Sequence, residues 1–313
     1  MLTFPVPAEL AGQRLDRFLQ NRMPRLSRSR AQEIIDSCAY RDDGKRRRAS
    51  DIVREGEIVL LVRERFQEPD TPLTFDVVHD DEAVLGVDKP AGLPMHPTAT
   101  YHKHTLSYLL KERYGDDEHT PSIAHRLDRE TSGVVLCGRS RRDVAALKRA
   151  FETRAVSKTY LAIVHGAMQA NAGEVTLSMA PTRDRLHVLM EVRDDGLEAA
   201  SEYRVLARAA AHSLVELHPR TGRQHQLRVH LAAIGHPVVG DKLYGAENEA
   251  PFLEYIETGM TAALEARLGH ARQALHAHKI RCAHPRTGEP FEVVAPLAAD
   301  LRALWERVSG SVL

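Results

Sequence analysis

The chain has 313 residues, which is enough for one large domain and one small accessory domain. Apolar residues make up 43% of it and charged residues 27%, which allows a sizeable core and is ordinary for a soluble protein. The formal net charge is zero, but basic residues outnumber acidic ones by 12 to 6 between Arg14 and Arg54, so a basic face for nucleic acid is not excluded.

The three cysteines, Cys38, Cys137 and Cys282, form no C-x-x-C pair, which argues against a disulfide framework or a cysteine-based zinc site. The N-terminus lacks the basic start and apolar run of a signal peptide, and no uncharged apolar stretch is long enough to span a membrane. We therefore expect a soluble, cytoplasmic protein without a membrane partner.

Residues 1–66 are expected to form a small α/β domain. Apolar residues recur at helical spacing between Leu15 and Leu19, and a second helix is predicted over residues 27–37 with Ser27 as its N-cap. A short strand is predicted over residues 57–62.

Residues 73–313 are expected to form a second, larger domain, behind a linker of residues 67–72 that holds two prolines and two acids. Strands are predicted at 73–78, 83–87, 134–137, 159–165, 202–206, 213–217, 279–282 and 291–294. Helices are predicted at 106–114, 141–154, 223–234 and 298–308, and residues 246–273 have the composition of a helical insertion. Strands do not alternate strictly with helices, so we expect an α+β fold with a mixed sheet rather than a doubly wound parallel one.

The segment His-Arg-Leu-Asp at residues 125–128 comes just before a buried strand, where rigid scaffolds often present functional groups. Asp128 is flanked by Arg126 and Arg129, which should keep its carboxylate ionised. The order of the residues differs from His-Arg-Asp-Leu, and the chain lacks a glycine-rich phosphate loop, which excludes a protein kinase. Taken locally, a surface cluster of ion pairs is the simpler explanation.

A second polar cluster lies at residues 220–231, where a Thr-Gly pair precedes the expected helix and arginines crowd its start. His225 and Arg228 are three residues apart and should share one helix face. Such a helix start can hold a phosphate or a carboxylate, although a solvated basic face is common too. His225 and His230 are five apart, which is poor spacing for chelating one metal ion.

Two further segments indicate a functional site only when they are taken together with the first two. Residues 158–166 form a strand-like run that contains Tyr160, and a tyrosine in a strand most often packs in the core. Residues 87–97 form a stiff loop that holds Lys89, three prolines and a glycine.

The four segments, in this order, resemble the RluA family of pseudouridine synthases. The resemblance rests on Lys-Pro-x-Gly-Leu, His-Arg-Leu-Asp-x-x-Thr-Ser-Gly, Lys-x-Tyr and Thr-Gly-Arg-x-His-Gln-Leu-Arg-x-His, and it runs from about Leu73 to Pro296. Residues 235–245 are similar to this family as well. Residues 1–66 resemble the alpha-L type of small RNA-binding domain, except that Arg41-Asp42-Asp43-Gly44 stands where an Asn-Gly turn is usual and four basic residues follow it.

The resemblance implies an α+β catalytic domain of the pseudouridine synthase type, with a mostly antiparallel mixed sheet. It implies an isomerase that breaks the bond between ribose and base in selected uridines and rejoins them through carbon, without a cofactor or a metal. Asp128 would be the catalytic carboxylate and the sole essential acid, Arg228 its ionic partner, and Tyr160 the ring that stacks on the target base. Arg126 would fill the space of the flipped nucleotide. Lys89, Arg223, His225 and Gln226 would contact phosphate or support the pocket.

The expected partner is RNA, with large-subunit ribosomal RNA favoured and transfer RNA as an alternative, and the expected state is a monomer. A catalytically silent ribosome-assembly factor is a second alternative. A metal-dependent hydrolase is suggested only by 17 histidines and the pairs His102/His104 and His276/His278, neither of which has a carboxylate at familiar ligand spacing.

Overall fold

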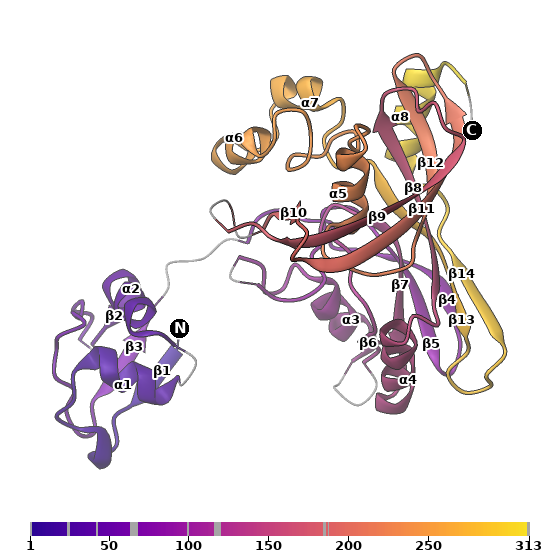
Figure 1. The fold of residues 1–313 in the computed structure, drawn as a ribbon. Helices are drawn as coiled ribbons and strands as arrows, with labels where there is room; N and C mark the ends of the chain where they lie inside the picture. Colours follow the sequence, from indigo (N-terminus) through magenta and orange to yellow (C-terminus); the bar gives the residue numbers. More distant parts are fainter. Residues whose placement is uncertain are drawn as a thin grey trace. The chain divides into compact units, whose positions relative to one another are not determined.

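The structure is a computed structural model that describes residues 2–23, 26–41, 43–62, 68–98, 100–115, 120–183, 186 and 188–311. The chain divides into two compact units, Met1–Gln67 and Glu68–Leu313, which are coloured along the sequence in Figure 1. Among the described residues, no helix is both long and apolar enough to cross a membrane.

The first unit packs two helices on a small sheet. The helices are α1 (Leu15–Arg22) and α2 (Arg28–Cys38), with a short 3-10 turn, η1 (Ala8–Leu10), before them. The strands β1 (Leu2–Pro5), β2 (Ala39–Tyr40) and β3 (Ile58–Leu61) pair in the order β1-β3-β2. Both predicted helices are confirmed, and Ser27 caps α2 as predicted because its hydroxyl accepts a hydrogen bond from the backbone of Arg30.

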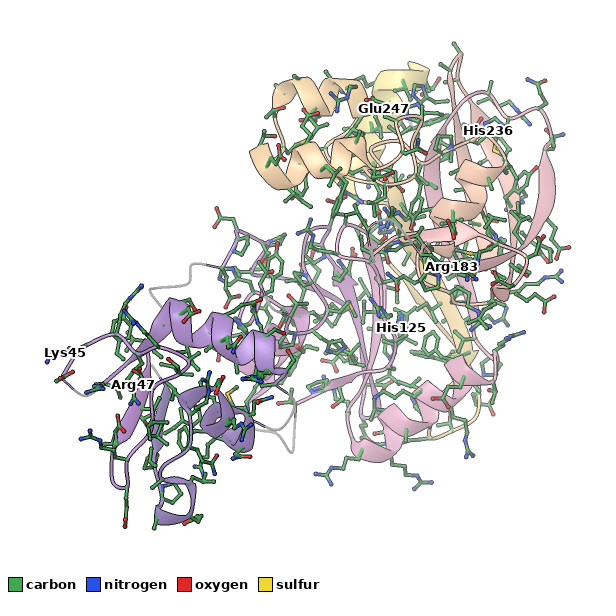
Figure 2. The ribbon with its side chains drawn as sticks, turned by 60° about the vertical axis from the view of Figure 1, so that its left-hand side comes forward. Lys45, Arg47, His125, Arg183, His236 and Glu247 are labelled. Carbon is green, nitrogen blue, oxygen red and sulfur yellow. The ribbon has the colours of Figure 1, made fainter. Side chains whose placement is uncertain are left out.

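Four consecutive basic residues, 45–48, divide between the surface and the interior of this unit. Lys45, Arg46 and Arg48 are exposed, whereas Arg47 is buried. Arg47 donates hydrogen bonds to the carboxylates of Asp51 and Glu57, so its charge is used inside the unit. Figure 2 labels Lys45 and Arg47.

The second unit is built on an eleven-stranded sheet, with the main order β10-β9-β11-β12-β8-β13-β7-β5-β4. In addition, β14 pairs with β13 and β6 pairs with β7. Its strands are β4 (Asp76–Asp80), β5 (Val84–Lys89), β6 (Ser122–Ile123), β7 (Ser132–Gly138), β8 (Ser157–His165), β9 (Ala172–Pro181), β10 (Met190–Val192), β11 (Leu197–Arg208), β12 (His212–Pro219), β13 (Leu275–Ala283) and β14 (Pro290–Val294). The pairing of β13 with β7 is parallel and the other described pairs are antiparallel, which confirms the mixed, mostly antiparallel sheet.

Helices cover this sheet over several apolar clusters. On the half formed by β5 and β7, α3 (Leu106–Tyr114) buries Leu106 and Leu110 against strand side chains. On the half formed by β8, β12 and β13, α5 (Gln226–Ala233) and α8 (Ala299–Ser309) contribute Leu227 and Leu304. The remaining helices are α4 (Arg141–Glu152), α6 (Ala250–Thr258) and α7 (Ala262–Leu268).

Most differences from the predicted elements concern ends and amphipathic strands. The predicted strand at 202–206 is only the middle of β11, and β9 and β10 were not predicted, because their exposed and buried residues do not alternate regularly. The helical insertion at 246–273 is confirmed by α6 and α7. Residue 67 of the predicted linker lies outside the described residues, while Glu68 belongs to the second unit and accepts backbone hydrogen bonds from residues 102–104.

Candidate active site

The segment that carries Asp128 is fixed on the buried strand β7. His125 Nε2 accepts a hydrogen bond from the backbone N–H of Leu136 at 3.0 Å. The His125 ring, labelled in Figure 2, stacks on Phe151 of α4 with 4.4 Å between ring centroids. Burial lowers the pKa of His125 to about 3, so the ring is neutral and can serve as this acceptor.

A cleft of about 680 Å³ opens beside Asp128, a volume suited to a small ligand or a single nucleotide unit. Its walls come from the Asp128 segment, the end of α4, the start of β8 and the loop before α5. The predicted site residues that line it are Arg126, Asp128, Tyr160, Arg223, His225, Gln226 and Arg228.

Arg228 forms an ion pair with Asp128, although the two residues are far apart in the sequence. Its Nη1 donates to Asp128 Oδ2 at 3.0 Å. Burial would by itself raise the pKa of Asp128, but the charge and hydrogen bond of Arg228 hold that pKa below its ordinary value. The Asp128 side chain is 23% exposed, so an ionised carboxylate faces the cleft.

The neighbours of Asp128 in sequence do not supply this charge, which corrects the expectation for Arg126 and Arg129. Arg129 donates to the hydroxyl of Tyr101 at 2.8 Å and to that of Tyr255 at 3.4 Å. Arg126 is exposed on the cleft wall. Adjacent side chains can point in different directions, so charge proximity in sequence was a poor guide to proximity in space.

A second buried carboxylate, Asp241, holds Arg228 from another direction. Arg228 Nε and Nη2 donate to its two oxygens at 2.6 and 2.8 Å. The backbone N–H groups of Leu243 and Tyr244 also donate to Asp241 Oδ1. No role was predicted for Asp241 from the sequence. The feature that could have pointed to it is its position within residues 235–245, which are similar to the RluA family.

Gln273 is another site residue that was not predicted. Its amide Nε2 donates to Thr131 Oγ1 at 2.6 Å and lies 3.4 Å from Asp128 Oδ2. Gln273 is buried, just before β13. Gln273 therefore helps to orient the Asp128 carboxylate from the side of the sheet. It was not predicted because a single glutamine at the end of an insertion matches no pattern that one sequence can reveal.

Tyr160 lies on β8, between its cross-strand partners Leu217 on β12 and Ala277 on β13. Its side chain lines the same cleft as Asp128. Burial, together with the negative charge of Asp128, raises the pKa of Tyr160 above its ordinary value, so the phenol is protonated at neutral pH.

The helix that carries Arg228 begins three residues later than predicted. His225 is the N-cap of α5 and has a left-handed backbone with φ 55°, which ends any regular helix there. His225 and Arg228 therefore do not share a helix face, yet both reach Asp128, because His225 Nε2 lies 3.9 Å from its Oδ1.

Gln226 and Arg223 build the turn before α5. Gln226 Oε1 accepts from the hydroxyl of Thr221 at 2.6 Å and from the backbone of Arg223 at 3.0 Å, and its Nε2 donates to Ala200 O and Ser201 Oγ on β11. Gln226 is buried, so its contacts are those of pocket support. Arg223 is half-buried, and its Nε donates to the backbone of β11.

Lys89 lies beneath the site rather than in the cleft. Its side chain is fully buried, and Nζ donates to the carbonyls of Pro90, Leu93 and Arg129 at 2.8, 3.0 and 3.0 Å. It thus ties the stiff loop after β5 to the segment that carries Asp128. Of the two roles expected for Lys89, these contacts favour pocket support.

The described residues contain no group of three or more histidine, cysteine or acidic side chains arranged to hold a metal ion. The two histidine pairs have other contacts. His104 Nδ1 is hydrogen-bonded to the carbonyl of Pro69, and His276 Nδ1 to the hydroxyl of Ser132.

Comparisons with known proteins agree with this fold. The family model described as RNA pseudouridylate synthase matches residues 83–233, which include the Asp128 segment, Tyr160 and Arg228. Two solved structures share the fold: human RNA pseudouridylate synthase domain containing 4 and domain containing 1. Both have a TM-score of 0.59 and 27% identity; they cover 74% and 76% of this chain, which in turn covers 92% and 90% of theirs.

Curated relatives extend the likeness over nearly the whole chain. The ribosomal large subunit pseudouridine synthase D of Xanthomonas campestris is 39% identical over 96% of this chain and 90% of its own length. The protein of the same name from Pseudomonas aeruginosa is 34% identical over 96% of this chain and 92% of its own length. This chain therefore belongs to the RNA pseudouridine synthase family and is an isomerase that modifies RNA. The resemblance to the RluA family is confirmed.

Proposed function

We propose that this enzyme converts specific uridines of large-subunit ribosomal RNA to pseudouridine, with Asp128 as the catalytic carboxylate. The observation that carries the role of Asp128 is an ionised carboxylate, paired with Arg228, that faces a cleft wide enough for one nucleotide. The ribosomal substrate is supported by the names of the relatives from Xanthomonas campestris and Pseudomonas aeruginosa. The predicted monomeric state and cytoplasmic location stay predictions.

The chemistry needs an anion beside the sugar. When the bond between the anomeric carbon and the base nitrogen breaks, positive character develops at that carbon, and the base departs with the bonding electrons. A carboxylate in contact with the sugar can capture that carbon or remove a proton from its neighbour, and both routes require the ionised form. Because Arg228 keeps the pKa of Asp128 low, this form is present at neutral pH.

The cleft walls suit a flipped nucleotide and its flanking phosphates. Tyr160 supplies an aromatic face for the uracil, and Arg126 is an exposed side chain that can fill the vacated place in the RNA helix. Arg223, Lys148 and Arg154 stand on the walls with exposed or half-exposed cationic groups. Such groups neutralise phosphates without reading the sequence.

We also propose that the first unit binds RNA. Asp16 is fully buried and accepts hydrogen bonds from Arg14 at 3.1 and 2.9 Å, and it lies 3.6 Å from Arg28 Nε. The Arg14 hydrogen bonds, which outweigh the effect of burial, lower the pKa of Asp16 to about 2. This buried acid orients arginines at the surface of α1 and α2, where Arg17 is exposed as well.

The test is to map pseudouridines at nucleotide resolution in total RNA from cells with and without the gene. Complementation with Asp128→Asn provides the catalytic control. We expect one or a few sites in large-subunit ribosomal RNA to disappear without the gene and to stay absent with Asp128→Asn. Sites in transfer RNA instead would contradict the ribosomal substrate, and full activity of Asp128→Asn would contradict its role.

A further inference from the structure

His225 stands next to Asp128 with a left-handed backbone and a fixed ring. Its φ of 55° lies in a region that few non-glycine residues adopt, and histidine, asparagine and aspartate are the ones enriched there. Its Nδ1 lies 2.7 Å from the hydroxyl oxygen of Tyr244, and both rings pack edge to face. Tyr244 belongs to the segment that also holds Asp241 through its backbone N–H.

The hydrogen bonds of Tyr244 define where the proton of His225 resides. The backbone N–H of Met190 donates to the Tyr244 oxygen at 2.9 Å, which occupies the hydroxyl as an acceptor. Among the described residues, His225 Nδ1 is then the partner to which the hydroxyl can donate. A neutral imidazole whose Nδ1 accepts carries its proton on Nε2. Burial, followed by the charge of Arg228, lowers the pKa of His225 to about 4, so the ring is neutral at pH 7.

The Nε2–H of His225 and the carboxylate of Asp128 face a common place in the cleft. The two atoms are 3.9 Å apart, which is too far for a hydrogen bond between them. An oxygen at about 2.8 Å from both atoms fits between them. Both side chains line the cleft, so a substrate atom can reach this place.

The substrate group that fits must accept one hydrogen bond and donate another. A uracil carbonyl can accept from His225 but cannot donate to Asp128, and it would meet the carboxylate with its own lone pairs. A phosphate oxygen is repelled by the charge of Asp128. A hydroxyl satisfies both partners. Within an RNA chain the 3′ and 5′ oxygens are esterified, so the 2′-hydroxyl is the remaining ribose hydroxyl.

We propose that Tyr244 and His225 position a neutral Nε2–H donor that, together with Asp128, binds the 2′-hydroxyl of the target uridine. This inference rests on the proposed role of Asp128. It makes His225 a substrate-contacting residue and Tyr244 a positioning residue that acts through it. The enzyme thereby distinguishes a ribose from a deoxyribose at the target nucleotide, and it holds the sugar beside the carboxylate.

The experiment uses two synthetic RNAs that contain the mapped uridine, one all-ribose and one with 2′-deoxyuridine at that site. Single-turnover rates and dissociation constants are measured for the full chain. For the wild type we expect the deoxy substitution to reduce the single-turnover efficiency about tenfold, as for the loss of a well-placed hydrogen bond. In His225→Leu and Tyr244→Phe we expect this penalty to shrink to about twofold. His225→Gln, whose amide nitrogen can occupy the place of Nε2, should retain part of it.

Tyr203→Phe is the matched control, because Tyr203 lies on β11 outside the cleft lining and should keep the full deoxy penalty. An undiminished penalty in His225→Leu would overturn the proposal. So would nitrogen-15 NMR spectra of the wild type that place the His225 proton on Nδ1. The catalytic role of Asp128 and the contact of His225 with the 2′-hydroxyl are tested separately. Activity in Asp128→Asn would contradict the first. The deoxy penalty in the His225 variants tests the second, because those variants keep Asp128.

Discussion

Arg228 donates two hydrogen bonds to Asp241, at 2.6 and 2.8 Å, while its remaining terminal nitrogen binds Asp128 at 3.0 Å. One guanidinium thus joins a fully buried acid to the acid that faces the cleft. Because a guanidinium is planar and its donors are fixed, the bidentate bond to Asp241 dictates the direction in which Nη1 points at Asp128.

We predict that Asp241→Asn lowers the single-turnover rate about tenfold or more and leaves RNA affinity nearly unchanged. The amide keeps the size of the side chain but replaces one of the two acceptor oxygens with an NH2 donor, so the bidentate pair is broken and the guanidinium loses its fixed direction. The free energy of unfolding should fall by about 3 kcal/mol, as for a broken buried ion pair. Asp300→Asn is the matched control, since Asp300 binds Arg272 with the same bidentate geometry outside the cleft. A wild-type rate in Asp241→Asn would show that Asp128 alone positions the arginine.

We predict that Arg228→Met moves the acid limb of the pH–rate profile to higher pH. Without the guanidinium, burial is unopposed and the pKa of Asp128 rises, so its active form is lost earlier as the pH falls. In the wild type the folded-state pKa is depressed. The Asp128–Arg228 pair therefore stabilises the fold at any pH above the unfolded-state pKa of an aspartate, which is about 3.9. This stabilisation is lost as the pH falls through the lower pKa of Asp128 in the folded protein. The double variant Arg228→Met/Asp241→Asn is measured as well, because it leaves no unpaired charge at Asp241. An unshifted acid limb in both variants would show that Arg228 does not set the pKa of Asp128.

Lys89→Met should destabilise the second unit by about 2 to 4 kcal/mol, because three carbonyls lose their common donor. Burial lowers the pKa of Lys89 to about 7. Between this value and the unfolded-state value of about 10.4, the unfolded chain binds more protons, so the wild type gains stability as the pH rises from 7 to 10. The difference between wild type and Lys89→Met in urea denaturation should therefore be larger at pH 9 than at pH 7. Lys148→Met, at an exposed position of α4, is the control substitution.

Tyr160→Phe and Tyr160→Leu should separate stacking from proton transfer. Phenylalanine keeps the aromatic face that we place against the uracil, whereas leucine does not. We expect Tyr160→Leu to weaken binding of the flipped uridine and Tyr160→Phe to slow only a step that uses the hydroxyl, measured as substrate affinity and single-turnover rate. Equal loss of affinity in both variants would contradict a stacking role.

Arg17→Ala/Arg28→Ala in the first unit should weaken RNA binding without changing the rate at saturating enzyme. Each lost phosphate contact should reduce the salt dependence of log Kd by about 0.7 to 0.9 units per log unit of salt. Binding titrations at several salt concentrations check this. Arg183→Ala, an exposed arginine of the second unit that is paired with Asp195, is the control. An unchanged salt slope in the double variant would exclude this unit from the RNA contact.

The sequence alone identified the class of fold, most of the helices and the central strands, since these depend on local periodicity and capping. The boundaries of α3 were predicted to the residue because Leu106 and Leu110 mark its buried face and Gly115 follows its end. Strands β9 and β10 escaped prediction, since their pairing comes from neighbouring strands rather than from their own residues.

Some residues of the candidate site were likewise identified from the sequence, and others only from the structure. The short motifs were sufficient to name Asp128, Tyr160 and Arg228, because the order of rare residue combinations is a property of the sequence. The family resemblance also named Arg228 as the ionic partner of Asp128, and the two side chains are hydrogen-bonded. Only the tertiary structure showed that Arg129 turns to other partners and that Asp241 and Gln273 complete the support. Ion pairs and hydrogen bonds act over a few ångströms, and the residues that come that close are decided by how β7, α5 and β13 pack, which no local pattern contains.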